Sequence, residues 1–134
     1  MFNPDLVKRP FAFSKEERLK SNLEIKQLFR QGRRLSQGPV SVIYLPDVYD
    51  PHQPSVQVAF SVPKRHIKKS VDRQLIKRRM REAYRLRRFG LLKTTFERKI
   101  KLKVLFMWSD RSILDYINTK ESIGILADRL ESEI

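Results

Sequence analysis

The stretch from residue 61 to residue 90 constrains this chain most, because it concentrates positive charge on one helical pattern. It carries twelve Lys or Arg and two Asp or Glu side chains, which is +10 of the +14 net charge of the 134-residue chain. We expect a helix from Ser70, an acceptable N-cap, to about Phe89, with Asp72 in the first turn and Gly90 ending it. Because most of its surface is charged, such a helix can bury only a narrow apolar stripe against the core.

A helical wheel over residues 71–88 separates the charged from the apolar positions. Five cations fall within an arc of about 100° together with the amide of Gln74: Lys77, Arg78, Arg81, Arg85 and Arg88. The expected core stripe consists of Ile76, Met80, Ala83 and Tyr84, with Arg73 at its border. A second, smaller apolar strip contains Val71, Leu75 and Leu86 and is interrupted by Glu82.

The cationic face indicates a polyanionic partner. Solvated helix faces usually mix both signs, whereas Lys77 and Arg81, and Arg81 and Arg85, are like charges four residues apart and repel each other. Nucleic acid is the expected partner, because arginine forks match phosphate. A membrane-bound helix would need a broader apolar face. A helix-turn-helix is disfavoured by the strands expected on either side of the helix.

The remaining pattern predicts one α+β domain over residues 15–134, preceded by an extended arm over residues 1–14. Ser21 and Glu24 form a capping box before a short helix with Ile25, Leu28 and Phe29, and Gly32 follows it. Strands are expected at residues 40–45, 56–61 and 101–108, a loop at 46–54, a short helical piece at 91–99, and a last helix capped by Thr119.

Composition narrows the function further. The chain has no cysteine, no apolar run long enough to cross a bilayer and no signal-peptide pattern at its start, so we expect a soluble cytoplasmic protein without membrane contact. His52 and His66 lie in a Pro-rich loop and in a basic turn, and no Gly-rich phosphate loop is present. We therefore expect no catalytic residue and no metal site in the chain alone, and no obligate protein partner.

Residues 61–85, which read SVPKRHIKKSVDRQLIKRRMREAYR, carry a specific resemblance. They resemble the signature of the bacterial ribonuclease P protein component family, in which a strand leads through a basic turn into an arginine-rich helix. Ser70 and Val71 match the opening of that helix, Arg73 its first Arg, and Lys77, Arg78, Arg81, Glu82 and Ala83 the remainder. Gln74 and Leu75 depart from it, because the family has Asn and a second Arg there.

The resemblance implies a ribosomal-protein-like sandwich in the order helix, strands, basic helix, strand, helix, with a left-handed βαβ crossover. It also implies a protein subunit that binds a catalytic RNA and the 5′ leader of precursor tRNA, while Mg²⁺ ions held mainly by the RNA promote hydrolysis of the leader. A ribosomal or RNA-chaperone protein is the alternative that composition fits equally well.

The candidate residues follow from the charge pattern and the resemblance together. The expected RNA contacts are Lys64, Arg65, Lys68, Lys69, Arg73, Gln74, Lys77, Arg78, Arg81, Arg85 and Arg88. For a cleft that receives the single-stranded leader we nominate the aromatic residues Phe13, Phe29 and Tyr44, since aromatic rings stack on unpaired bases.

Overall fold

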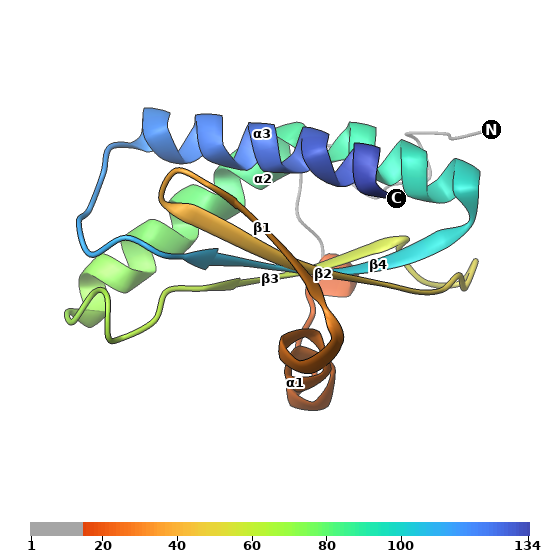
Figure 1. The fold of residues 1–134 in the computed structure, drawn as a ribbon, viewed down its shortest axis with the longest axis horizontal. Coiled ribbons are helices and arrows are strands. Elements are labelled where there is room, and N and C mark those ends of the chain that lie inside the picture. The colour runs from red at the N-terminus through yellow and green to blue at the C-terminus, as the bar shows by residue number, and fades with distance from the viewer. Residues whose placement is uncertain (1–14) are drawn as a thin grey trace.

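A four-stranded mixed sheet with helices on both faces organises residues 15–134, the part of the chain that the computed structural model describes (Figure 1). The arm expected over residues 1–14 lies outside the described residues. The elements in chain order are a 3₁₀ turn Lys15–Glu17, α1 Asn22–Gln31, β1 Arg33–Gln37, β2 Val40–Val48, β3 Val56–Ser61, α2 Ser70–Arg98, β4 Ile100–Trp108 and α3 Tyr116–Glu133. The expected α+β class is confirmed.

The strand order in the sheet is β1-β2-β4-β3. β1 pairs with β2 and β2 with β4 in antiparallel fashion, whereas β3 and β4 are parallel neighbours. Parallel neighbours need a long crossover connection, and here α2 supplies it. β3, α2 and β4 thus form the βαβ unit to which the resemblance assigns a left-handed crossover.

Side chains alternate between the two faces of the sheet, so each face has its own core. On the α2 and α3 face, the larger core includes Val42 and Tyr44 of β2 and Val104 and Phe106 of β4. On the opposite face, α1 packs through Leu28 and Ile25 onto Ile43, Leu45, Leu105 and Met107. Figure 1 shows α2 and α3 on one side of the sheet and α1 alone on the other.

The first helix begins as the capping box predicts. The hydroxyl of Ser21 accepts a hydrogen bond from the backbone N–H of Glu24 at 3.4 Å, and the helix runs to Gln31. Gly32 follows with extended φ and ψ angles, and a Cβ there would clash with the Leu28 carbonyl and the Ile43 side chain. This glycine therefore permits the close approach of α1 to β2.

Helix α2 is longer than the sequence predicts, because it passes through Gly90 and continues to Arg98. The separate helical piece expected at residues 91–99 is its last part. Leu91, Leu92 and Thr95 are buried and extend the core stripe, and this packing outweighs the cost of about 1 kcal/mol for a glycine inside a helix. The helix ends instead before Lys99, its C-cap residue, which has a left-handed φ of 52°.

Three further boundaries differ from the expected ones. β1 is a strand for which the sequence predicts no residue range; it pairs with β2 across a turn in which Gly38 has a φ of 55°. β2 extends past Pro46 to Val48, where its pairing with β1 has already ended and the missing N–H of proline is tolerated. Asp115, not Thr119, caps α3, while Thr119 is buried inside the helix.

Within residues 15–134, none of the helices combines the length and the apolar character that crossing a bilayer requires.

Candidate nucleic-acid interface

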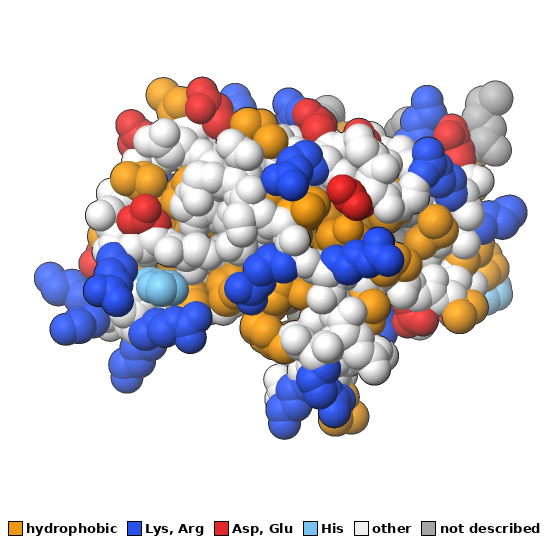
Figure 2. Space-filling view, viewed as in Figure 1, with side chains coloured by type: hydrophobic (Ala, Val, Ile, Leu, Met, Phe, Trp, Pro, Cys, Tyr) orange, Lys and Arg blue, Asp and Glu red, His pale blue; other side chains and the backbone are white. Residues whose placement is uncertain are grey.

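Most of the predicted cationic residues lie together at one end of the molecule, where β3 leads into α2. Lys64, Arg65, Lys68 and Lys69 are all exposed in the turn before the helix. Gln74 and Arg78 are exposed on its first turns, and Lys77 and Arg81 are half-buried beside them. Figure 2 shows one group of Lys and Arg side chains at this end, with others spread over the same face. The turn and the first three turns of α2 form a single cationic surface, residues 64–81.

Arg73 has a structural role in this surface. Its guanidinium donates hydrogen bonds to the carbonyl oxygens of Ile67 at 3.1 Å and Lys68 at 2.6 Å. Through these two hydrogen bonds Arg73 links the basic turn to the first turn of α2 and fixes the backbone at Lys68 and Lys69. The side chain remains half-buried at the border of the wheel, as its position at the edge of the apolar stripe indicates.

Arg85 is partly neutralised within its own helix. Its guanidinium makes two hydrogen bonds to the carboxylate of Glu82, at 2.6 and 3.0 Å. The same contact lowers the pKa of Glu82 below its ordinary value, so the carboxylate stays ionised at neutral pH. A phosphate approaching Arg85 would have to compete with this carboxylate.

Arg88 corrects the predicted set, because its side chain has an exposed fraction of 0%. Its Nε lies 3.0 Å from the carboxylate of Glu17, which is itself buried, and its Nη1 donates to the carbonyl oxygen of Arg85. The segment Lys15–Glu17 brings the carboxylate to this position from about 70 residues away in the sequence. A helical wheel over α2 alone contains no information about that partner, so Arg88 is part of the core and not of the exposed surface.

The three aromatic residues nominated for the leader cleft do not come together. Phe29 lies on the outer side of α1 with 53% of its surface exposed. Tyr44 is buried on the opposite face of the sheet, where its hydroxyl donates to Glu133 of α3 at 3.3 Å. Burial and the Glu133 carboxylate raise the pKa of Tyr44. The prediction for Tyr44 is therefore wrong, and Phe13 lies outside the described residues.

Two groups of residues outside the predicted contact set lie near these sites. Lys26 and Arg30 of α1 and Arg33 and Arg34 of β1 are exposed cations. Val71 and Leu75, the first two members of the smaller apolar strip, line a groove on α2 among the cations. Their position beside the charged face of the helix is the sequence signal for this groove.

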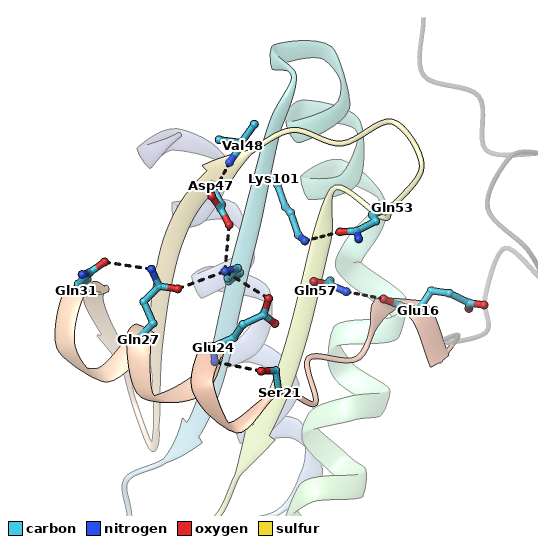
Figure 3. A network of polar contacts seen from close by, with 11 residues as sticks. Glu16, Ser21, Glu24, Gln27, Gln31, Asp47, Val48, Gln53, Gln57 and Lys101 are labelled. Carbon is cyan, nitrogen blue, oxygen red and sulfur yellow. Dashed lines mark hydrogen bonds and ion pairs between the residues drawn. The ribbon is translucent and has the colours of Figure 1, made fainter.

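Helix α1 is held on the sheet by one buried lysine of β4. The Lys103 amine lies 3.0 Å from Asp47 and 3.6 Å from Glu24, and it donates to Gln27 at 3.4 Å, while 6% of its side chain is exposed. Figure 3 shows Glu24, Gln27 and Asp47 pointing toward one another from α1 and β2. Besides the apolar contacts of Leu28, this network fixes the helix that presents Phe29.

Protonation of Asp47 should weaken this network. The pKa of its carboxyl is lowered by the hydrogen bond from the Val48 backbone N–H and by Lys103. A carboxyl with a lowered pKa in the folded state stabilises the fold above its ordinary pKa, and this contribution disappears as the pH falls through the lowered value. We expect Asp47→Asn to flatten the fall in the free energy of unfolding below about pH 5. Urea titrations from pH 7 to pH 3 test this, and parallel profiles for the two proteins would contradict it.

The described residues contain no group of three or more His, Cys, Asp or Glu side chains placed to hold a metal ion. Between residues 64 and 85 the acidic side chains are Asp72 and Glu82, and Glu82 forms an ion pair with Arg85. The chemistry of the surface is therefore that of cations and amides, which bind anions.

Comparisons of the sequence with a family model and with known proteins indicate the same family. Residues 13–111 match the model of the family described as Ribonuclease P. The chain is 34% identical over 107 residues to the ribonuclease P protein component of Porphyromonas gingivalis, covering 79% of this chain and 77% of that protein. It is 42% identical over 82 residues to the ribonuclease P protein component of Chlorobaculum tepidum, covering 59% of this chain and 53%, about half, of that protein.

Solved structures share the fold at low sequence identity. The Staphylococcus aureus RNase P protein superposes with a TM-score of 0.66 at 14% identity, covering 85% of this chain and 94% of that one. The Thermotoga maritima RNase P protein gives a TM-score of 0.65 at 16% identity, covering 84% and 96%. At these identities the likeness concerns the arrangement of helices and strands.

Proposed function

The chain belongs to the bacterial ribonuclease P protein component family, and we propose that it binds the catalytic RNA and the 5′ leader of precursor tRNA as the protein subunit of ribonuclease P. The observation that carries this proposal is the cationic surface of residues 64–81, which combines an exposed basic turn with exposed and half-buried cations of α2. Like charges this close together repel one another, and a polyanion relieves the repulsion.

Binding to the RNA would proceed through phosphate contacts. Arg78 and Arg81 form no salt bridge with any residue between 15 and 134, so their guanidinium groups are available to phosphate oxygens. Each phosphate that a cation neutralises releases condensed counterions, which makes the affinity fall steeply with salt concentration. Arg73 would contribute by holding the basic turn in place.

The leader would contact the opposite side of the sheet. Phe29 offers an exposed ring for stacking on an unpaired base, and Lys26 and Arg30 on the same helix are exposed cations for its phosphates. This assignment replaces Tyr44, which is in the core. The Lys103 network supports it by fixing α1, and therefore Phe29, on the sheet.

The chain supplies RNA-binding side chains in this proposal, while the chemistry of cleavage lies with the RNA. Mg²⁺ held mainly by the RNA subunit would activate water for phosphodiester hydrolysis, which leaves a 5′-phosphate on the tRNA. The protein would hold the 5′ leader of the precursor tRNA in position relative to the catalytic RNA.

Reconstitution tests the proposal. Purified protein is mixed with a bacterial ribonuclease P RNA and precursor tRNA at a low Mg²⁺ concentration, where the RNA alone is slow. We expect the protein to stimulate removal of the 5′ leader and to remove none without the RNA. Intact RNA binding without stimulation would favour a ribosomal or RNA-chaperone protein instead. Leader removal by the protein alone would contradict the non-catalytic role.

Neutralising Glu82 should strengthen RNA binding. In Glu82→Gln the carboxylate that competes with phosphate for Arg85 is removed, and the surface loses one negative charge. We expect a higher affinity for RNA and a salt slope steeper by up to about one unit, which corresponds to one added phosphate contact. Fluorescence anisotropy of labelled RNA at several KCl concentrations measures both, with the exposed Glu121→Gln on α3 as the matched control. An unchanged slope would mean that Arg85 does not reach the RNA.

A further inference from the structure

A shallow groove of about 550 Å³ runs along the first three turns of α2, within the cationic surface. It is lined by Ser70, Val71, Gln74, Leu75, Lys77, Arg78 and Arg81. None of these side chains is acidic, and three are cationic. The charge of the groove therefore complements an anion.

Part of the groove is apolar, which a surface for phosphate alone does not require. Val71 has 79% of its surface exposed, and Leu75 follows it by four residues on the same side of the helix. Single exposed apolar side chains are common on protein surfaces. Here the exposed Val71 and the half-buried Leu75 both line a groove with Lys77, Arg78 and Arg81, so a ligand that fills the groove meets cations and aliphatic carbon at once.

A nucleotide combines the chemical features that this lining complements. Its phosphate is an anion, its base has a flat apolar face, and the base edge carries hydrogen-bond donors and acceptors. Gln74 presents an amide with both a donor and an acceptor in the same groove. In an A-form duplex the base faces are stacked and hidden, whereas in a single strand, a loop or a bulge they are accessible.

We infer that this groove binds an unpaired RNA nucleotide, with the base against Val71 and Leu75, its edge near Gln74, and its phosphates near Lys77, Arg78 and Arg81. The inference rests on the proposed function, because it states which kind of RNA segment the cationic surface prefers. Two aliphatic side chains are too narrow a strip for a membrane surface, and the net positive charge of the groove disfavours a second copy of this chain.

Substitution of Val71 distinguishes contacts with the base from contacts with the phosphates. Val71→Ser keeps the charge, and its high exposure makes loss of folding unexpected. The probes are a labelled single-stranded oligopyrimidine RNA and a blunt-ended RNA duplex with the same number of phosphates. We expect the variant to lose about tenfold in affinity for the single strand, since burying one aliphatic side chain is worth about one power of ten in Kd. Its affinity for the duplex and both salt slopes should stay unchanged.

Val48→Ser is the matched control, because Val48 is 83% exposed at the end of β2, beside the C-terminal end of α2 and not among the residues that line the groove. It should bind both probes as the wild type does. Equal losses on the two probes, or no loss on either, would overturn the inference. Displacement of the single strand by poly-glutamate as efficiently as by unlabelled RNA would also overturn it, in favour of an acidic peptide. If the wild-type protein binds neither probe, the proposed function itself fails.

Discussion

Replacing Arg88 by Met should lower the free energy of unfolding by about 3–5 kcal/mol, since it leaves the buried carboxylate of Glu17 without this cation. The two side chains are 0% and 6% exposed and lie 3.0 Å apart, so water cannot replace the lost guanidinium. A small domain has a total stability of roughly 5–15 kcal/mol, and the loss is a large share of it. Urea unfolding monitored by circular dichroism measures the change.

The double variant Glu17→Leu with Arg88→Met provides the control. Because apolar side chains often replace a buried ion pair at little cost, we expect it to recover most of the stability that the single variant loses. It should also bind RNA with the salt slope of the wild type, since Arg88 does not reach the surface. A double variant as unstable as the single one, or a shallower salt slope, would contradict the buried role of Arg88.

Ile76→Ala should destabilise the fold by about 2–5 kcal/mol, through lost burial and the cavity that the smaller side chain leaves. Ile76 is fully buried where α2 packs on the sheet, one helical turn from Met80 in the same core. The effect should reach RNA binding only through the fraction of protein that is folded. Equilibrium unfolding in urea gives the change in stability.

Ile117→Ala on α3 makes the same chemical change at a position that is 64% exposed. We expect it to alter the stability by no more than about 0.5 kcal/mol. If the two isoleucine variants lowered the free energy of unfolding equally, the side of α2 that packs on the sheet would not be the stripe of Ile76, Met80, Ala83 and Tyr84.

Features that depend on neighbouring residues could be predicted from the sequence, and those that depend on distant residues could not. The cap of α1 by Ser21 and the buried stripe of α2 follow from local spacing, and both are confirmed. Gly90 alone predicts the end of the helix. Leu91, Leu92 and Thr95 are buried in the folded protein, however, and this burial stabilises the continuation of the helix to Arg98. β1 lacks an apolar alternation and forms because β2 pairs with it.

The candidate site divides in the same way. Helical periodicity sets Lys77, Arg78 and Arg81 away from the core stripe, which leaves Arg78 exposed and the other two half-buried. The cations before Ser70 are exposed because they lie in the turn that precedes the helix. Arg88 lies on the same arc, yet Glu17 reaches it through the tertiary fold and buries it. Tyr44 could not be assigned to a face of the sheet until the strand alternation and the side of α1 were known. The groove that Val71 and Leu75 line could not be predicted from the sequence, because its shape depends on the folded structure.

The salt dependence of RNA binding tests the role of the α2 cations most directly. The double variant Arg78→Ala with Arg81→Ala is compared with the wild type on a bacterial ribonuclease P RNA, and Lys93→Ala serves as a control from the exposed side of the same helix. We expect the slope of log affinity against log salt to become shallower by about two units in the double variant, about one for each lost phosphate contact, and not in the control. A slope equal to that of the wild type would mean that this surface does not hold the RNA.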